Sequence, residues 1–304
     1  LSIYMIIEST KEARLTRALN SLQGLSVGDA FGEKFFVHPD VAENLINLRA
    51  LPSGVWYYTD DTQMALSIVS ILQQYQEINQ DALARDFAER YDTERGYGAA
   101  MHKLLTDIRD NNKNWRQLAT SLFNGQGSYG NGAAMRVAPL GAYFADNMDL
   151  LVDQAIKSAE ITHAHPEASS GAVAVAVAAG IASNSIVTKQ QFFNQVIKYI
   201  PDSEVKSKIQ HASNLSENIS IENAAAILGN GAKVSAQDTV PFALWCAAQH
   251  LDNYTEAIWT TVRGLGDRDT TCAIVGGIVA CSAGAESIPT EWLQARETLP
   301  NVET

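Results

Sequence analysis

Two stretches of this sequence are apolar on every side, and they constrain the fold more than any other feature. The first runs from Gly171 to Gly180 and the second from Ala273 to Ala280, and both consist of small and β-branched residues. A helix without a polar face has to be covered by other elements all around. The small residues also allow neighbouring helix axes to approach closely. The sequence therefore predicts a bundle with at least two central helices.

Helical spacing also dominates the rest of the chain. Apolar residues recur at intervals of three and four, whereas alternating runs rich in β-branched and aromatic residues are scarce. Helices are expected at approximately Lys11–Val27, Asp61–Tyr75, Asp81–Tyr91, Trp115–Phe123, Ala133–Phe144, Leu150–Thr162, Glu167–Ser183, Lys189–Tyr199, Val205–Ser216, Thr239–Gln249, Tyr254–Leu265 and Thr270–Gly284. No linker rich in Gly, Ser or Pro divides the chain. We expect a single all-α domain over residues 1–304, built from a dozen or more helices.

The composition restricts the class of partner and the compartment. The formal net charge of -12 argues against broad binding to nucleic acids or anionic membranes. Cys246, Cys272 and Cys281 lie in apolar helical sequence without a pairing pattern, which fits a reducing compartment. Leu1–Ile7 is apolar but has no basic flank or cleavage site, and no apolar run is long enough to span a bilayer. A cytoplasmic protein is expected.

Two acidic clusters are the main candidates for chemistry. They are the segments Trp56–Gln63, with Thr59, Asp60 and Asp61, and Gly266–Thr271, with Asp267, Asp269 and Thr270. Each runs directly into an apolar helical stretch. Helix capping explains either cluster taken alone, because Thr and Asp are favoured N-cap residues. Capping accounts less well for two aspartates that flank Arg268 within one turn. Brought together, the clusters offer four carboxylates and two hydroxyls, an all-oxygen set that suits Mg2+ or Mn2+.

Three further segments carry weaker signals. The Gly-rich loop at Ser128–Arg136 precedes a helix and is either an ordinary turn or a phosphate cradle built from backbone amides. The two histidines in Ile161–Glu167 either cap a helix at a surface turn, or ligate a metal or contact a ligand. Zinc is not expected there, because no Cys or third His lies at suitable spacing. The glycines in Gly24–Glu33 indicate close helix packing that ends in a C-cap.

Together, these segments resemble the ADP-ribosylglycohydrolase family. The family motifs occur in the same order: a Gly-Asp-Ala-x-Gly turn, Thr-Asp-Asp, Gly-Asn-Gly-x-x-Met-Arg, Thr-His and, near the C-terminus, Asp-x-Asp-Thr. The similarity spans approximately Leu19 to Ala283. The resemblance implies an orthogonal all-α bundle and a hydrolase that removes ADP-ribose from modified protein side chains.

The resemblance also implies the residues of the site. The ligands of two divalent metal ions, Mg2+ or Mn2+, would be Thr59, Asp60, Asp61, Asp267, Asp269 and Thr270. The residues around the ADP-ribose would be Ser128, Tyr129, Gly130 and Asn131, which match the diphosphate loop, and His163. Asp61 and Asp269 are our candidates for the catalytic general base, because a carboxylate beside the metals can accept a proton from water.

Two positions depart from the family pattern. The family usually has a glutamate four residues after the second glycine of the Gly-Asp-x-x-Gly turn, but this position is Phe36, and Glu33 is the nearest carboxylate. The residue between the two metal aspartates is often small in the family and is Arg268 here. Because a guanidinium leaving group is cationic, we expect ADP-ribosyl-arginine as substrate, with Glu33 and Asp92 facing it.

Two alternatives remain open at this point. A metal-dependent phosphohydrolase also uses Asp-x-Asp, but normally after a β-strand in an α/β fold, and the strand rhythm is missing here. A non-catalytic protein that binds ADP-ribose or another protein is the second alternative, since the resembled family includes a lens crystallin. The expected partner is an ADP-ribosylated protein or ADP-ribose conjugate, with no nucleic acid and no membrane.

Overall fold

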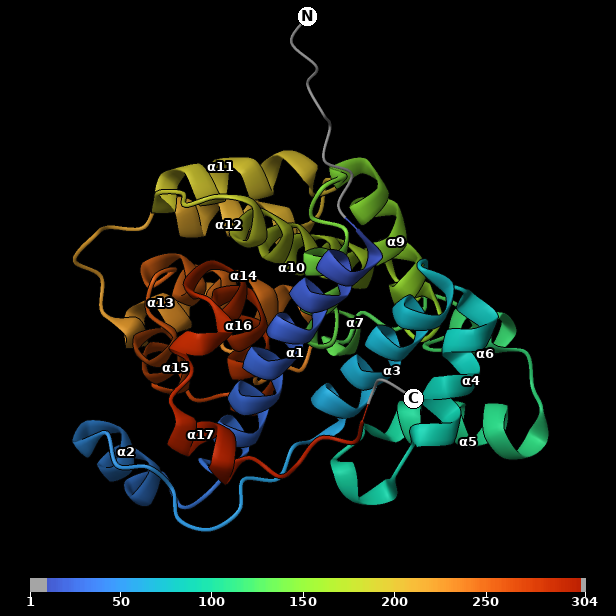
Figure 1. Cartoon of the computed structure of the whole chain (residues 1–304), viewed down its shortest axis with the longest axis horizontal. Coiled ribbons are helices and arrows are strands. Elements are labelled where there is room, and N and C mark those ends of the chain that lie inside the picture. Colours follow the sequence, from blue (N-terminus) through green and yellow to red (C-terminus); the bar gives the residue numbers. More distant parts are fainter. Residues whose placement is uncertain (1–9, 302–304) are drawn as a thin grey trace, which may run out of the picture.

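The computed structural model describes residues 10–301, which are predominantly helical (Figure 1). The α-helices are α1 (Lys11–Glu33), α2 (Pro39–Leu48), α3 (Asp60–Tyr75), α4 (Gln80–Arg90), α5 (Ala99–Asn111), α6 (Trp115–Ser121), α7 (Gly132–Met135), α8 (Ala138–Tyr143), α9 (Met148–Glu160), α10 (Pro166–Asn184), α11 (Lys189–Tyr199), α12 (Glu204–Ser213), α13 (Ile221–Leu228), α14 (Ala236–Gln249), α15 (Tyr254–Val262), α16 (Arg268–Ala283) and α17 (Thr290–Ala295). Two short 3-10 helices are η1 (Thr93–Arg95) and η2 (Ala285–Ser287). The described part of the chain forms no strand, so the all-α prediction is confirmed. The α/β fold that the phosphohydrolase alternative requires is not present in these residues.

No helix between residues 10 and 301 is both long enough and apolar enough to cross a bilayer. The apolar segment Leu1–Ile7 lies outside the described residues.

Helices α1 and α16 are in direct backbone contact at the centre of the bundle. Gly24, Gly28 and Gly32 recur every four residues along α1 and face α16. A Cβ atom built on Gly28 would lie 2.2 Å from the carbonyl oxygen of Cys272, and one on Gly32 the same distance from that of Arg268. No side chain fits into this space. The glycine stripe therefore brings the C-terminal end of α1 against the first turn of α16.

The expected close helix packing at these glycines is confirmed, but the expected C-cap is wrong. Helix α1 continues through the stripe and ends at Glu33. Glycine weakens an isolated helix, yet here α16 covers the exposed backbone and makes the stripe a contact surface.

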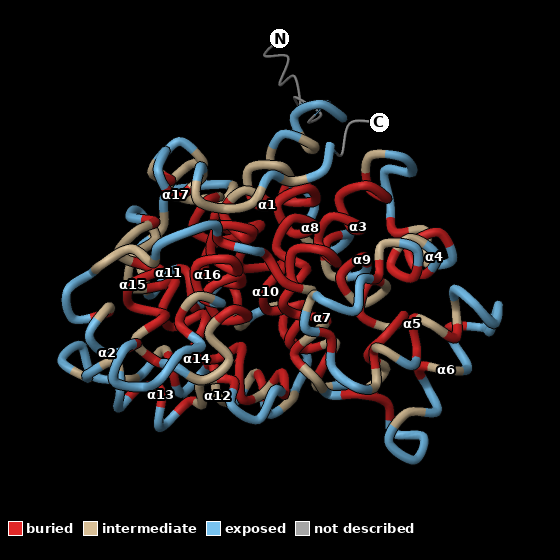
Figure 2. The backbone as a smooth tube through the Cα atoms, turned by 90° about the horizontal axis from the view of Figure 1, so that it is seen from below, coloured by how far each residue is buried: buried red, intermediate tan, exposed pale blue. Residues whose placement is uncertain are grey.

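The two fully apolar stretches lie in the interior, as expected. Residues 170–182 of α10 and 269–280 of α16 are buried, and Figure 2 shows both helices inside the bundle. Helix α8 approaches α10 in the same way as α1 approaches α16, because a Cβ on Gly141 would lie 2.0 Å from the carbonyl oxygen of Ala176.

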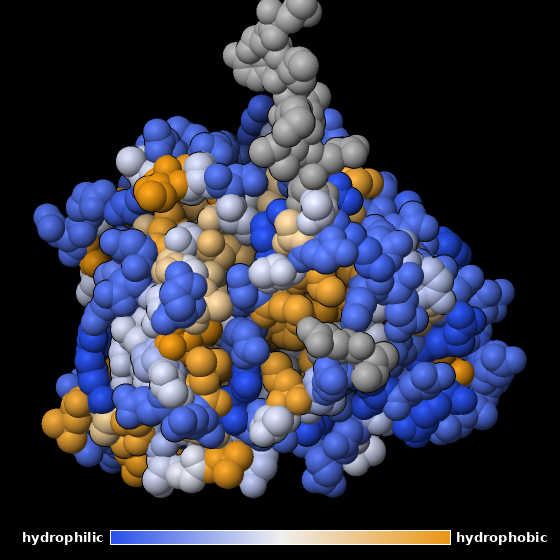
Figure 3. Space-filling view, viewed as in Figure 1, coloured by the Kyte–Doolittle hydropathy of each residue, from blue (hydrophilic) through white to orange (hydrophobic). Residues whose placement is uncertain are grey.

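Some expected boundaries differ from the structure. The single helix expected at Ala133–Phe144 is divided into α7 and α8, because Pro139 has no N–H to donate to the carbonyl of Met135. Helices α2, α5, α13 and α17 were not expected. Each of them buries at most four side chains. Helix α2 leaves Val41 and Leu48 exposed, where apolar side chains appear at the lower left of Figure 3.

The C-terminal segment holds the approach to α3. The backbone N–H of Trp56 donates to the carbonyl of Ala295 at 2.7 Å, and that of Glu297 donates to the carbonyl of Trp56 at 2.9 Å. The side chain of Glu297 in turn accepts from the backbone N–H of Tyr58 at 2.9 Å. The chain therefore reaches Thr59, the N-cap of α3, along a fixed path.

Candidate functional site

Three helix ends converge on a buried acidic cluster. Asp29 near the end of α1, Asp61 in the first turn of α3 and Asp269 in the first turn of α16 place carboxylate oxygens within 4.8 Å of one another. The glycine contact between α1 and α16 accounts for the approach of Asp29 to Asp269. The structure thus joins the two predicted acidic clusters and adds Asp29, to which the sequence analysis gave no role. The only available signal was the position of Asp29 inside the Gly-Asp-Ala-x-Gly motif.

Thr59 lies at the centre of this cluster. Its hydroxyl oxygen is 2.7 Å from Oδ1 of Asp29, 2.9 Å from Oδ1 of Asp61 and 3.3 Å from Oδ2 of Asp269. A hydroxyl has one hydrogen and can donate it to only one of these oxygens. The other close oxygen pairs need a proton or a cation between them.

Asp29 is fully hydrogen-bonded and braces the start of α3. Its carboxylate accepts from the backbone N–H of Thr59 at 2.9 Å and from that of Thr62 at 3.2 Å. It also accepts from the hydroxyl of Thr62 at 2.6 Å. These bonds hold the first turn of α3 against α1, so Asp29 has a structural task that Asp61 and Asp269 lack.

Capping does not explain the second acidic cluster. Thr59 does cap α3, at 3.4 Å from the backbone N–H of Asp61, but Asp267, the N-cap of α16, makes no side-chain capping bond. Oδ2 of Asp61 and Oδ1 of Asp269 are buried and accept no hydrogen bond within the described residues. Buried carboxylate oxygens without partners are costly. A hard divalent cation would satisfy them, so this donor set fits Mg2+ or Mn2+.

The electrostatics of the cluster indicate the same need for a cation. Burial, followed by repulsion from Asp269, raises the pKa of Asp61 well above the ordinary value. Burial and the neighbouring Asp267 do the same to the pKa of Asp269. Burial also raises the pKa of Asp60 to about 7 and that of Asp29 to about 6. Protons and a divalent cation therefore compete for these carboxylates.

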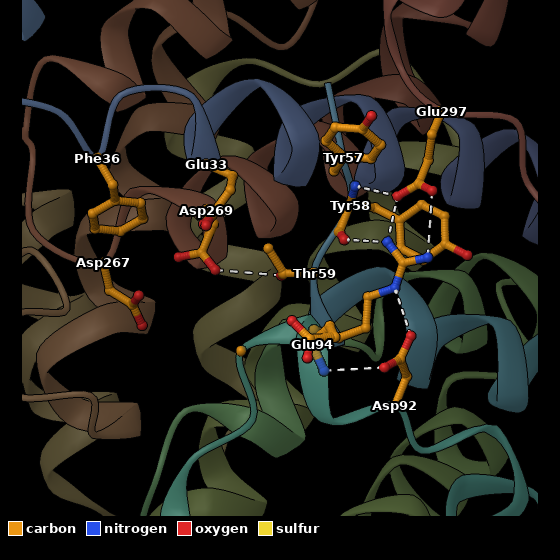
Figure 4. Close-up of a pocket in the computed structure, with 12 residues that line it drawn as sticks. Glu33, Phe36, Tyr57, Tyr58, Thr59, Asp92, Glu94, Asp267, Asp269 and Glu297 are labelled. Carbon is orange, nitrogen blue, oxygen red and sulfur yellow. Dashed lines mark hydrogen bonds and ion pairs between the residues drawn. The ribbon is translucent and has the colours of Figure 1, made fainter. Parts of the chain in front are cut away.

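Two hollows flank the acidic cluster and share Gly96, Asp267 and Asp269 among their lining residues. The first has a volume of about 680 Å³ and is also lined by Glu33, Phe36, Tyr57, Tyr58, Thr59, Asp92, Glu94, Arg95 and Glu297 (Figure 4). The second, of about 490 Å³, is lined by Asp60, Asp61, Thr270, Phe123, Ser128, Tyr129, Gly130, Asn131, His163 and Lys233, among others. Every site residue named from the sequence therefore lines one hollow or both. A ligand with a scissile bond at the cluster would extend into each hollow.

The first hollow is acidic, but one cation occupies part of it. Arg95 forms an ion pair with Glu297, and its Nε lies 3.8 Å from Oδ2 of Asp92. Its guanidinium also stacks over the ring of Tyr58, 3.8 Å from the ring centre. Asp92 also accepts from the backbone N–H of Glu94 at 3.0 Å. Asp92 and Glu297 are thus engaged, whereas Glu33 and Glu94 form no ion pair with a described residue. Burial, followed by repulsion from Asp29 and Asp267, raises the pKa of Glu33 to about 7.

The two departures from the family pattern contact each other at this hollow. The guanidinium of Arg268 lies 4.5 Å from the centre of the Phe36 ring and donates to the carbonyls of Phe35 and Gly266. Phe36, which is half-exposed, lines the hollow opposite Asp92 (Figure 4). At this position the hollow is thus lined by an aromatic ring that packs against a cation.

The Gly-rich loop is tied to the acidic cluster. The amide of Asn131 donates to Oδ2 of Asp267 at 2.7 Å and to the hydroxyl of Thr239 at 3.0 Å. Two backbone amides of the loop are already used, since Gly130 donates to the hydroxyl of Ser128 and Asn131 to the carbonyl of Val234. Asn131 therefore orients a carboxylate of the cluster, and the expected amide cradle does not include these two groups.

Comparison with known proteins decides the family. The ADP-ribosylglycohydrolase family model matches residues 10–303. The chain belongs to this family. It is 27% identical over 329 residues to ADP-ribosylhydrolase ARH3 of Mus musculus, covering 93% of this chain and 88% of that protein. It is 23% identical to ADP-ribosylarginine hydrolase Tri1 of Pseudomonas putida, covering 94% and 75%.

A solved structure shares the fold. The ADP-ribosylglycohydrolase-related protein complex superposes with a TM-score of 0.60 at 23% sequence identity, and the match covers 94% of both chains. Family membership supports an ADP-ribosylhydrolase activity on ADP-ribosylated substrates. The resemblance inferred from the sequence motifs is therefore confirmed.

Proposed function

We propose that this protein is a metal-dependent hydrolase that releases ADP-ribose from ADP-ribosylated protein side chains. The observation that carries the proposal is the position of the acidic cluster between two hollows, with Oδ2 of Asp61 and Oδ1 of Asp269 buried and unbonded. A non-catalytic binding protein has no need to maintain such costly groups. The glycosidic bond would lie at the cluster, with ADP-ribose in the second hollow and the side chain in the first.

The proposed metal ligands are those implied by the motifs, with a binuclear arrangement. They are Thr59, Asp60, Asp61, Asp267, Asp269 and Thr270, and all line one of the hollows. A pair of Mg2+ or Mn2+ ions, when bound, supplies a water of lowered pKa and balances the carboxylate charge. Asp29 stays outside this set because its hydrogen bonds brace α3.

The remaining steps belong to the side chains of this protein. Asp61 and Asp269 are the candidates for the general base, because a carboxylate beside the metal site can accept a proton from the attacking water. Their negative charge also stabilises the positive charge that develops on the ribose ring as the glycosidic bond breaks. Both roles need the buried, water-poor setting that the two helix ends create.

The second hollow offers two exposed aromatic rings for the nucleotide part of the ligand. Phe123 and Tyr129 both line it, and their ring centres lie 6.3 Å apart. A planar base can stack on such rings, a contribution of about 1–3 kcal/mol. The sequence analysis named Tyr129 but not Phe123, because a single exposed aromatic residue in a loop carries no pattern.

Arginine-linked ADP-ribose is the proposed substrate. The first hollow has six carboxylates and a single engaged cation among its lining residues, and a guanidinium suits that charge. Similarity to a protein named ADP-ribosylarginine hydrolase supports this choice, whereas the name ARH3 specifies no linkage.

A comparison of three substrates tests the preference. With Mg2+ present, the initial rate of ADP-ribose release should be higher for ADP-ribosyl-arginine than for ADP-ribosyl-serine or O-acetyl-ADP-ribose. Glu33→Gln should reduce the arginine rate about two- to fivefold, since one charge pair near solvent is worth up to about 1 kcal/mol. Glu77→Gln, at an exposed position outside both hollows, is the matched control. Faster release from serine than from arginine would refute the preference.

A further inference from the structure

A fully buried arginine directly follows Met135, which lines the second hollow, and Asp60 is the one carboxylate that acts on it electrostatically. Arg136, in the turn between α7 and α8, forms no ion pair with any described residue. Its guanidinium donates to the carbonyl of Ser158 at 2.8 Å and to the hydroxyl of Thr162 at 2.9 Å, and lies 4.5 Å from the ring centre of Phe87. Burying a cation in this way is expensive. The proposed metal site does not use Arg136, so its presence needs another explanation.

The hydrogen bonds run from Arg136 towards the ligand hollow. The hydroxyl oxygen of Thr162 lies 2.6 Å from Nδ1 of His163. Because a guanidinium can only donate, Thr162 accepts from Arg136. The single hydrogen of Thr162 has no other acceptor within residues 10–301 and is therefore directed at Nδ1 of His163. A ring nitrogen that accepts carries no proton, so the proton of the neutral ring belongs to Nε2.

The Nε2 side of the ring faces the Gly-rich loop. A Cβ built on Gly132 would lie 2.8 Å from Nε2 of His163, and one built on Gly130 would lie 3.3 Å from it. His163 is itself a lining residue of the second hollow. Glycine at these two positions leaves room for the ring to stand at the edge of the hollow.

We propose that Arg136 and Thr162 are positioning residues that fix His163 as the Nε2–H tautomer, which donates a hydrogen bond to a ligand oxygen in the second hollow. Burial and the nearby Arg136 lower the pKa of His163 to about 3, so the ring stays neutral. His163 is then a permanent hydrogen-bond donor. It serves neither as a base nor as a metal ligand.

The two halves of this proposal are tested separately. The tautomer is a property of the protein alone, whereas the ligand half rests on the proposed function because ADP-ribose is the probe. Long-range 1H–15N correlation spectra of the imidazole rings report which nitrogen is protonated, and His163→Gln identifies the signal among the six histidines. We expect Nε2–H in the wild type from pH 6 to pH 8.

The matched pair Thr162→Val and Thr162→Ser separates positioning from packing. Thr162→Val keeps the shape but removes the hydroxyl, so His163 should lose the pure Nε2–H state and ADP-ribose affinity should fall about tenfold. Thr162→Ser restores the hydroxyl and should restore both. Mn2+ affinity should be unchanged in all variants. An Nδ1–H signal in the wild type, or wild-type spectra and affinity in Thr162→Val, would overturn the proposal.

Discussion

Asp269→Asn is expected to abolish metal-dependent turnover while stabilising the metal-free protein. The carboxylate of Asp269 is buried beside Asp61 and Asp267, and its Oδ1 accepts no hydrogen bond in the described structure. A neutral amide removes the repulsion and can donate to a neighbouring carboxylate. Losing a ligand oxygen should lower Mn2+ affinity at least about a hundredfold and kcat/KM about a thousandfold.

Thermal unfolding with and without Mn2+ measures both effects. The metal-free variant should melt about 2 °C or more above the metal-free wild type, and Mn2+ should raise Tm of the wild type only. Asp252→Asn, an exposed position in the loop after α14, is the matched control and should behave as the wild type. An Asp269→Asn protein with normal Mn2+ binding and normal turnover would contradict the assignment of the acidic cluster.

Gly28→Ala is expected to destabilise the protein strongly. The new Cβ would lie 2.2 Å from the carbonyl oxygen and 2.8 Å from the carbonyl carbon of Cys272. Both atoms belong to the rigid backbone of α16 and cannot move aside independently. The two helices have to separate, at a cost of about 3 kcal/mol or more, and Asp29 moves away from Asp269 with them.

Denaturant titration gives the free energy of unfolding for this variant. The control is Gly98→Ala, where φ is −68° and no atom lies within 4 Å of the new Cβ. Because Gly98 is the N-cap of α5, that substitution should lower the free energy of unfolding by at most about 1 kcal/mol. Equal free energies of unfolding for Gly28→Ala and the wild type would show that α1 and α16 are not held in backbone contact.

Helix content and the members of the site were accessible from sequence because they leave local patterns. The apolar stretches predicted α10 and α16, and each acidic cluster lies at the start of a helix, α3 or α16. Such signals depend on neighbouring residues only. They predicted which groups would be present without predicting their exact partners.

Contacts between distant segments could not be predicted in this way. Three hydrogen bonds join elements that are far apart in the sequence. They connect Asp29 with Thr59 at the start of α3, Asn131 with Asp267, and Glu297 with Tyr58. The packing of Arg268 on Phe36 is of the same kind. These two residues are far apart in the sequence and come into contact only because α1 and α16 lie side by side. One residue of such a pair carries no information about its partner.

The chemistry of the cluster is tested most directly by its dependence on metal. The protein is stripped of metal, and release of free ADP-ribose from an ADP-ribosylated protein is followed by chromatography with EDTA, Mg2+ or Mn2+. Our account predicts no release in EDTA and restored release when either ion is added. Release that proceeds equally in EDTA, or that fails with both ions on arginine-, serine- and acetyl-linked substrates alike, would contradict it.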